Sequence, residues 1–209
     1  IFINTVNSMK RTFLALAALT VSAGAMAQSS VTVFGVADVS VAHISTSTKS
    51  VSGLANGGNS SSRLGFRGVE DLGGGLKAGF WLEGSLSVDD GTASGFKFDR
   101  RSTVSLTGNF GEVRLGRDKT PAYQNLETFH AFGDTGMGAI SGHNLITSAG
   151  GTAEGSNPKR VSNGISYLLP KLGGVYGQVT HSFGEQSGNN SLASNTGLRL
   201  GYANGPVNV

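Results

Sequence analysis

The sequence predicts an all-β fold, an antiparallel β-barrel that spans a membrane. Three observations carry this prediction: apolar and polar residues alternate over several segments, glycine is frequent, and short and long connections alternate along the chain. Glycine accounts for 33 of the 209 residues, against a usual share of about 7%. Glycine at this density suits strands, bulges and tight turns, and the alternation argues against a disordered linker.

The alternation of apolar and polar residues defines about eight strands. In the first, Val31 and Val33 fall on one face, whereas Thr32 and Asp38 fall on the other. A period of two residues is typical of a strand whose faces meet different surroundings. The segments with this pattern are 31–41, 63–67, 76–88, 102–107, 113–115, 160–168, 175–183 and 198–202.

The connections between these segments differ in length in a regular way. The short ones are expected at 70–75, 108–111, 170–174 and 204–206, and the long ones at 45–61, 89–99, 118–158 and 184–195. Short turns on one side and long loops on the other are typical of a transmembrane β-barrel. A soluble β-sandwich also alternates, but its loop lengths are not segregated by side.

The N-terminal region predicts export. An apolar run over 13–21 follows two basic residues, and a small-x-small tripeptide ends at Ala27. This is the pattern of a cleaved secretory signal, so we expect a signal peptide at 9–27, upstream read-through at 1–8 and the exported segment over 28–209. No later apolar run is long enough to span a bilayer as a helix, so a membrane would have to be crossed by strands.

The polar face of the strands predicts a water-filled interior. Because a bilayer offers no water to backbone groups, only a closed barrel pairs every strand. The apolar face would meet lipid, and the polar face would line a lumen. The inward positions include Arg63, Arg67 and Arg160, which do not form a packed plug, and this favours an open aqueous channel.

Composition argues against several other classes of function. The sequence has no cysteine, and therefore no disulfide and no thiolate metal site. The exported segment carries 14 basic and 13 acidic residues, with no basic block for a nucleic-acid partner. The histidines lack metal-binding spacing, and no serine lies in a Gly-x-Ser-x-Gly elbow. We expect no cofactor, no metal and no catalytic residue. A secreted β-rich adhesin or binding module and an outer-membrane barrel enzyme remain as alternatives.

Three blocks of sequence resemble Gram-negative general porins of the Burkholderia, Bordetella and Neisseria type. They are Ser29–Asp38, Ser61–Ala78 and Leu106–Arg117. The resemblance implies an outer-membrane location and a homotrimer surrounded by outer-membrane lipid. It implies barrels of about 16 strands, each with its own pore for inorganic ions and small hydrophilic solutes. This chain would then contain roughly the first half of such a barrel, as an N-terminal fragment.

The resemblance also implies a constriction inside the pore. The third external loop, expected at 118–158, would fold into the lumen and face a row of basic residues. By motif position this row is Arg63, Arg100 and Arg160. Alternation along the fourth strand instead places Arg101 inward. A bulge would reconcile the two, and both arginines stay candidates.

Glu127 and Asp134 are the expected acidic partners on that loop. Many porins carry a glutamate before a Phe-Gly pair there, where this chain has Ala131. Opposed charges across a narrow aqueous gap create a field that orients solutes, and the excess of arginine predicts a mild anion preference. The other residues expected to face the lumen are Asp38, Arg67, Lys77 and Glu83.

Overall fold

The computed structural model describes residues 30–92, 97–132, 159–170, 172–185 and 194–209. The expected signal peptide, the upstream segment and Asp134 lie outside the described residues. Within these ranges, no helix has the length and apolar character needed to cross a membrane.

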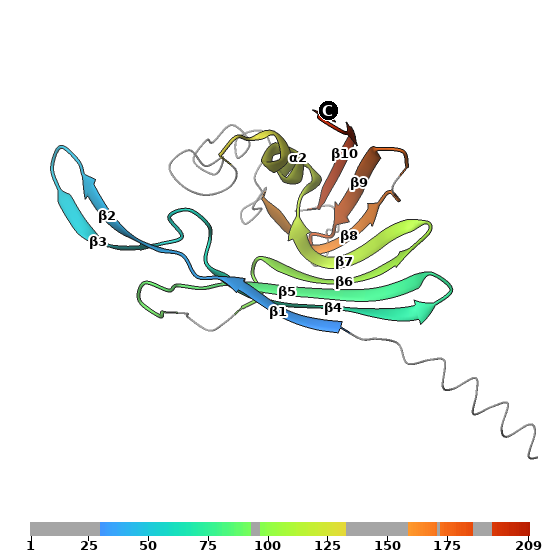
Figure 1. Ribbon diagram of the computed structural model, residues 1–209, viewed down its shortest axis with the longest axis horizontal. Coiled ribbons are helices and arrows are strands. Elements are labelled where there is room, and N and C mark those ends of the chain that lie inside the picture. Colours follow the sequence, from blue (N-terminus) through green and yellow to red (C-terminus); the bar gives the residue numbers. More distant parts are fainter. Residues whose placement is uncertain (1–29, 93–96, 133–158, 171, 186–193) are drawn as a thin grey trace, which may run out of the picture.

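Most of the described chain forms one curved antiparallel sheet (Figure 1). Its strands lie in the order β1-β4-β5-β6-β7-β8-β9-β10-β11, so from β4 onward each strand pairs with its neighbour in sequence. The edges of this sheet are β1 and β11, and it does not close on itself within the described residues. The strands are β1 Ser30–Val36, β4 Arg63–Gly73, β5 Leu76–Ser85, β6 Arg101–Gly108, β7 Gly111–Lys119, β8 Arg160–Leu168, β9 Val175–Ser182, β10 Asn195–Asn204 and β11 Val207–Asn208.

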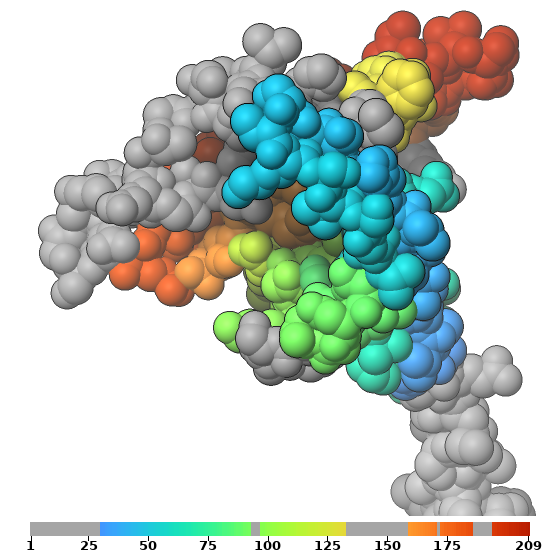
Figure 2. Space-filling view, turned by 90° about the vertical axis from the view of Figure 1, so that its left-hand side faces the viewer, coloured from blue at the N-terminus to red at the C-terminus, as the bar shows by residue number. Residues whose placement is uncertain are grey.

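A separate hairpin projects from the end of β1. It consists of β2 (Val39–Ser45) and β3 (Ser50–Asn56), and in Figure 2 it stands at the front of the molecule. The expectation of a polar loop over 45–61 was therefore wrong for part of that range. Apolar residues pair across its strands, as Val41 does with Leu54, but frequent serine hid this pattern.

The two faces of the main sheet differ in polarity, which confirms the all-β antiparallel fold class. The register places Arg67 beside Trp81 and Trp81 beside Thr103, so polar and charged groups share the face that carries the helix. The opposite face exposes apolar side chains such as Leu198, which is 74% exposed. Apolar surface this extensive is unusual on a soluble monomer and suits contact with hydrocarbon.

Short turns lie at one end of the sheet and long connections at the other. The antiparallel order places the β4–β5, β6–β7, β8–β9 and β10–β11 turns together. In the first of these, Gly73, Gly74 and Gly75 have φ of +82°, +62° and +81°, a conformation that glycine adopts at little cost. The segregation of connection lengths is therefore as the sequence predicted.

A bulge lies near the start of β8. The pairing of β7 with β8 shifts between Gly116 and Asp118, so that two residues of β8, including Asn163 with φ of +55°, lie opposite one residue of β7. Beyond the bulge Arg160 pairs with Lys119. A bulge re-aims the side chains that follow it, and here it brings both cations to the same end of the concave face.

Helix α2 (Pro121–Phe129) lies on the concave side of the sheet (Figure 1). Thr120 is its N-cap and accepts a hydrogen bond from the Tyr123 N–H at 3.2 Å, and proline follows at the first helical position, which it favours. A Cβ on Gly197 would lie 3.1 Å from Pro121 Cδ, so the helix packs closely on β10. The segment expected at 118–158 thus begins with the last residues of β7 and a helix.

Candidate functional site

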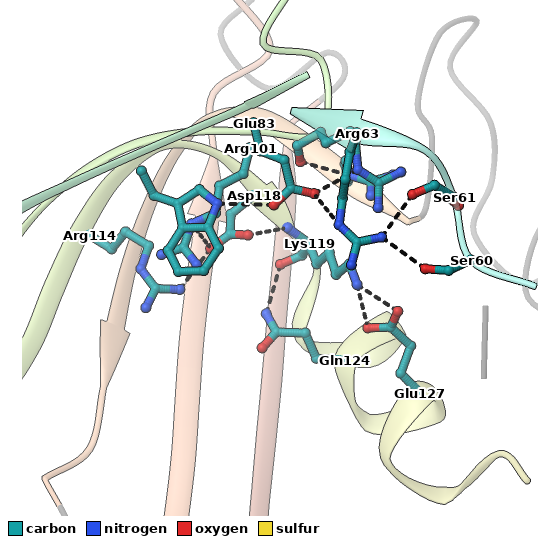
Figure 3. Close-up of a pocket in the computed structure, with 13 residues that line it drawn as sticks. Ser60, Ser61, Arg63, Glu83, Arg101, Arg114, Asp118, Lys119, Gln124 and Glu127 are labelled. Atoms are coloured by element: carbon teal, nitrogen blue, oxygen red, sulfur yellow. Dashed lines mark hydrogen bonds and ion pairs between the residues drawn. The ribbon is translucent and has the colours of Figure 1, made fainter. Parts of the chain in front are cut away.

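An open cavity of about 440 Å³ lies on the concave face, between the long-connection ends of the strands and α2 (Figure 3). Six basic side chains and three carboxylates line it, so its lining carries an excess of positive charge. The lining residues are Ser60, Ser61, Arg63, Trp81, Glu83, Arg100, Arg101, Arg114, Asp118, Lys119, Gln124, Glu127 and Arg160.

Glu83 joins two of the arginines. Its Oε1 accepts a hydrogen bond from Arg100 Nε at 2.7 Å and lies 3.7 Å from Arg63 Nε. Its Oε2 accepts from Trp81 Nε1 at 3.0 Å. Arg63 is the more accessible partner, with 28% of its side chain exposed, and it also donates to Ser61 O at 2.8 Å.

Asp118 forms a second acidic centre one strand pair further along. Its Oδ2 accepts from Arg114 at 2.7 Å and lies 3.6 Å from Arg101 Nε. Arg114 also pairs with Glu112 at 2.8 Å, so its charge is compensated twice. Arg101 has the longer contact to a carboxylate and donates to Thr103 Oγ1 at 3.0 Å.

Glu127 of α2 forms an ion pair with Lys119, the last residue of β7. Both carboxylate oxygens accept from Lys119 Nζ, at 2.6 Å and 2.8 Å. Gln124 Nε2 donates to Lys119 O at 3.0 Å, so two side chains of the helix hold the end of β7. The prediction set Glu127 against the arginine row. Glu127 lines the same cavity as these arginines, and its direct ion-pair partner is Lys119.

Arg160 lies deepest among the basic residues of the cavity. The residue is 8% exposed, and its Nε donates to the backbone carbonyl of Arg100 at 2.7 Å. Arg100 and Arg101 both line the cavity, because Arg100 immediately precedes β6 and reaches back to Glu83. The two arginines that the sequence left as candidates therefore line the same cavity, and β6 pairs with its neighbours without a register shift.

The remaining residues predicted to face the lumen lie elsewhere. Asp38 sits between β1 and β2, where its carboxylate accepts from the backbone N–H groups of Asn59 (3.0 Å) and Ser60 (2.6 Å). Lys77 is exposed near the short turns, and neither Asp38 nor Lys77 lines a cavity described here. Arg67 lines a second cavity.

This second cavity, of about 410 Å³, continues the first along the concave face toward the short turns. Trp81, Arg101 and Arg114 line both cavities, so the two are parts of one groove. Its polar lining also includes hydroxyl groups, among them those of Thr103 and Ser105. The described residues contain no cluster of three histidine, aspartate or glutamate side chains that could hold a metal ion.

The sequence analysis missed several lining residues, chiefly Arg114, Asp118, Lys119 and Gln124. Alternation along β7 places Arg114 and Asp118 on the face shared with Glu112, and this signal was available. Alternation could not predict the places of Lys119 and Gln124, because these depend on the bulge in β8 and on α2.

Comparisons with known proteins agree with this arrangement. Residues 15–209 match the family of Gram-negative porins. The chain is 48% identical over 207 residues to outer membrane porin protein 32 of Delftia acidovorans, covering 96% of this chain and 58% of that protein. It is 31% identical to an outer membrane porin protein of Bordetella pertussis, with the same coverage of each.

Solved structures give the same result. The anion-selective porin from Comamonas acidovorans is similar with a TM-score of 0.76 at 48% identity, covering 86% of this chain and 55% of that one. OmpT of Vibrio cholerae shares the fold, with a TM-score of 0.55 at 15% identity over 85% of this chain and 46% of that one.

A sheet that is apolar outside and charged inside defines an outer-membrane β-barrel protein. The chain belongs to the family of Gram-negative porins. Members of this family are channels rather than enzymes, which favours the channel interpretation over the enzyme and adhesin alternatives. The chain spans a little over half the length of the Delftia and Bordetella relatives.

Proposed function

We propose that this protein forms a water-filled channel through which ions and small hydrophilic solutes diffuse passively, with a preference for anions. The observation that carries the proposal is the lining of the first cavity, where six cations face three carboxylates. The structure similar to this chain at 48% identity is that of an anion-selective porin, which supports the same sign of selectivity.

The channel would be completed by strands that pair with the two edges of the sheet. β1 and β11 have free edges in the described residues, and an open edge inside a bilayer leaves backbone groups without partners. We propose that the described sheet is part of the wall of a closed barrel, with the segment 118–158 folded into its lumen. The packing of α2 on β10 supports this placement.

The basic residues act through an uneven distribution of charge. Glu83, Asp118 and Glu127 each bind a cation at 2.6–2.7 Å. Arg63 keeps only a longer contact to a carboxylate, at 3.7 Å. A positive surplus in a narrow aqueous space with walls of low dielectric raises the local concentration of anions. We therefore propose that Arg63, Arg101 and Arg160 attract anions most strongly. Arg100 completes the basic row with its charge offset by Glu83, and Glu127 and Asp134 are the acids of the loop.

We also propose that the protein assembles as a homotrimer, on the basis of its family. The broad apolar outer face supplies surface for both subunit contact and lipid contact. Mass measurement of the native protein in detergent by light scattering tests this, and a monomeric mass would contradict it.

The test of channel function is a reversal-potential measurement on the protein purified from outer membranes and inserted into planar bilayers. In a salt gradient, the expected potential has the sign of anion preference. A potential of the opposite sign, or no conductance, would overturn the proposal.

Two substitutions locate the selectivity. Arg63→Ser and Arg160→Ser are expected to lower the anion-to-cation permeability ratio while the barrel still assembles, since lumen substitutions mainly tune selectivity. Arg117→Ser is the matched control, because Arg117 lines neither cavity and instead donates to Asp99 O at 2.7 Å. An equal change in all three variants would remove Arg63 and Arg160 from the proposal.

A further inference from the structure

Trp81 is the only tryptophan among the 209 residues, and it lies where the two cavities meet. Guanidinium groups approach its ring from both neighbouring strands. The guanidinium carbon of Arg67, on β4, lies 5.1 Å from the ring centroid, and that of Arg101, on β6, lies 4.6 Å from it. Both distances are within the range of cation–π attraction.

Arg67 depends on this aromatic contact for its position. In the described part of the chain, no carboxylate lies within ion-pair distance of Arg67. Its guanidinium group instead rests against Trp81 and against Phe34, at 5.4 Å. The two rings contact each other edge to face, with centroids 5.0 Å apart.

The sequence makes room for this pair of rings. Phe34 pairs with Gly65 across β1 and β4, and a Cβ on Gly65 would collide with the tip of the Phe34 ring. A glycine directly beneath an aromatic ring marks a close approach that any side chain would block. The rings therefore form a fixed platform on the lumen side of β4 and β5, and they hold Arg67 where no carboxylate of the described residues compensates its charge.

The indole ring of Trp81 also limits how closely Arg101 approaches Asp118. The Nε of Arg101 lies 3.6 Å from Asp118 Oδ2, which is longer than the 2.7 Å contact that Arg114 makes to the same oxygen. Without the indole face, the Arg101 guanidinium group is free to move toward Asp118. A closer ion pair would neutralise a charge that now faces the groove.

We propose that Trp81 is a positioning residue for anion selectivity: it holds Arg67 apart from carboxylates, keeps the contact of Arg101 to Asp118 long, and so extends the cationic lining from the first cavity into the second. The inference rests on the proposed channel function. It assigns the strength of the preference partly to a residue that carries no charge.

The test compares neutral substitutions by reversal potential. Trp81→Leu is expected to lower the anion-to-cation permeability ratio by about two- to five-fold, the range that a partly exposed cation–π contact supports. Trp81→Phe keeps an aromatic face and is expected to retain most of the ratio. Phe66→Leu is the matched control, because Phe66 pairs with Leu82 on the opposite face of the sheet and is expected to change nothing.

A second arm separates positioning from a general structural effect. Arg67→Gln is expected to lower the ratio in the wild-type background and to have little further effect in Trp81→Leu, since coupled residues are not additive. The inference is overturned if Trp81→Leu matches the wild type, or if the effects of Trp81→Leu and Arg67→Gln add fully. If Trp81→Leu does not assemble, Trp81→Thr, which also lacks an aromatic ring, gives the same cycle when combined with Arg67→Gln. A wild-type protein without anion preference would overturn the proposed function instead.

Discussion

The two halves of the concave wall differ in the charge and the exposure of their polar side chains. On β4–β7, charged side chains line the open cavities. On β8–β10, the inner face is built mainly from neutral groups that are almost fully buried: Ser166, Gln178, Thr180 and Ser182 are 2–4% exposed. Helix α2 packs on β9 and β10 of this half. Arg199 belongs to this second half and lies against the Tyr176 ring at 5.6 Å.

Burial explains this difference. A hydroxyl or amide group can be buried if it finds a hydrogen-bond partner, and Ser166 and Thr180 share such a bond at 2.8 Å. A charge loses more by leaving water, so most of the cations lie on the open half. Arg160 of β8, which is 8% exposed, donates to the Arg100 carbonyl at 2.7 Å. The wall therefore has an open part, which would act on solutes in the proposed channel, and a buried part, whose strands β9 and β10 support α2.

The largest expected effect comes from placing a charge on the covered half. Thr180→Asp would bury a carboxylate among neutral groups, and we expect a loss of about 3–5 kcal/mol in the free energy of unfolding. Unfolding by guanidinium in lipid vesicles measures this loss. Ser105→Asp is the matched control, because Ser105 pairs with Arg114 on the open half and is expected to change stability little. Equal losses in both variants would contradict the comparison.

A smaller effect is expected from removing a charge on the open half. Glu83→Gln deprives Arg100 of its 2.7 Å partner, which should reduce the free energy of unfolding by about 1–3 kcal/mol. The same change adds a net positive charge to the cavity, so the reversal potential should shift toward stronger anion preference. An unchanged potential would show that Glu83 does not influence permeating ions.

The attachment of the covering helix can be weakened directly. Thr120→Ala removes the N-cap of α2 and is expected to cost about 1 kcal/mol. Hydrogen exchange of the backbone amides at 122–129 should become faster. Thr120→Ser keeps the hydroxyl group and should preserve protection, and faster exchange in that variant would argue against the capping role.

The smallest effect concerns screening of the open half by salt. The Debye length falls from about 10 Å at 0.1 M salt to about 3 Å at 1 M. If the cations act through water, the anion-to-cation permeability ratio should decline across this range in the same bilayer. A constant ratio would point to selection by direct contact instead.

The sequence predicted the polarity of the two faces because hydrocarbon and water impose it on every second residue. Val31 and Thr32 are enough to orient the first strand. The hairpin at 39–56 was missed because its strands contain several serines, and its apolar pairs are recognised only once the strands are aligned. Thr120 followed by Pro121 is a typical helix start and could have predicted α2. It was overlooked because the segment after it has no regular apolar period.

The cavity could be predicted only in part. The family resemblance placed Arg63, Arg100 and Arg160 in one row, and all three line the same cavity. The pairing of Glu83 with Arg100 spans 17 positions of sequence and follows from how the strands are aligned. The contact between Lys119 and Glu127 depends on a helix, and no strand periodicity encodes it.

The fastening of the hairpin at Asp38 has a practical consequence. Because Asp38 binds the backbone at 59–60, the base of the hairpin is fixed where the long connections begin. Its tip at 46–49 projects away from the curved sheet (Figure 1) and lines neither cavity, and lengthening a surface loop costs little entropy. An epitope tag inserted there offers a handle for antibody labelling that leaves permeation untouched.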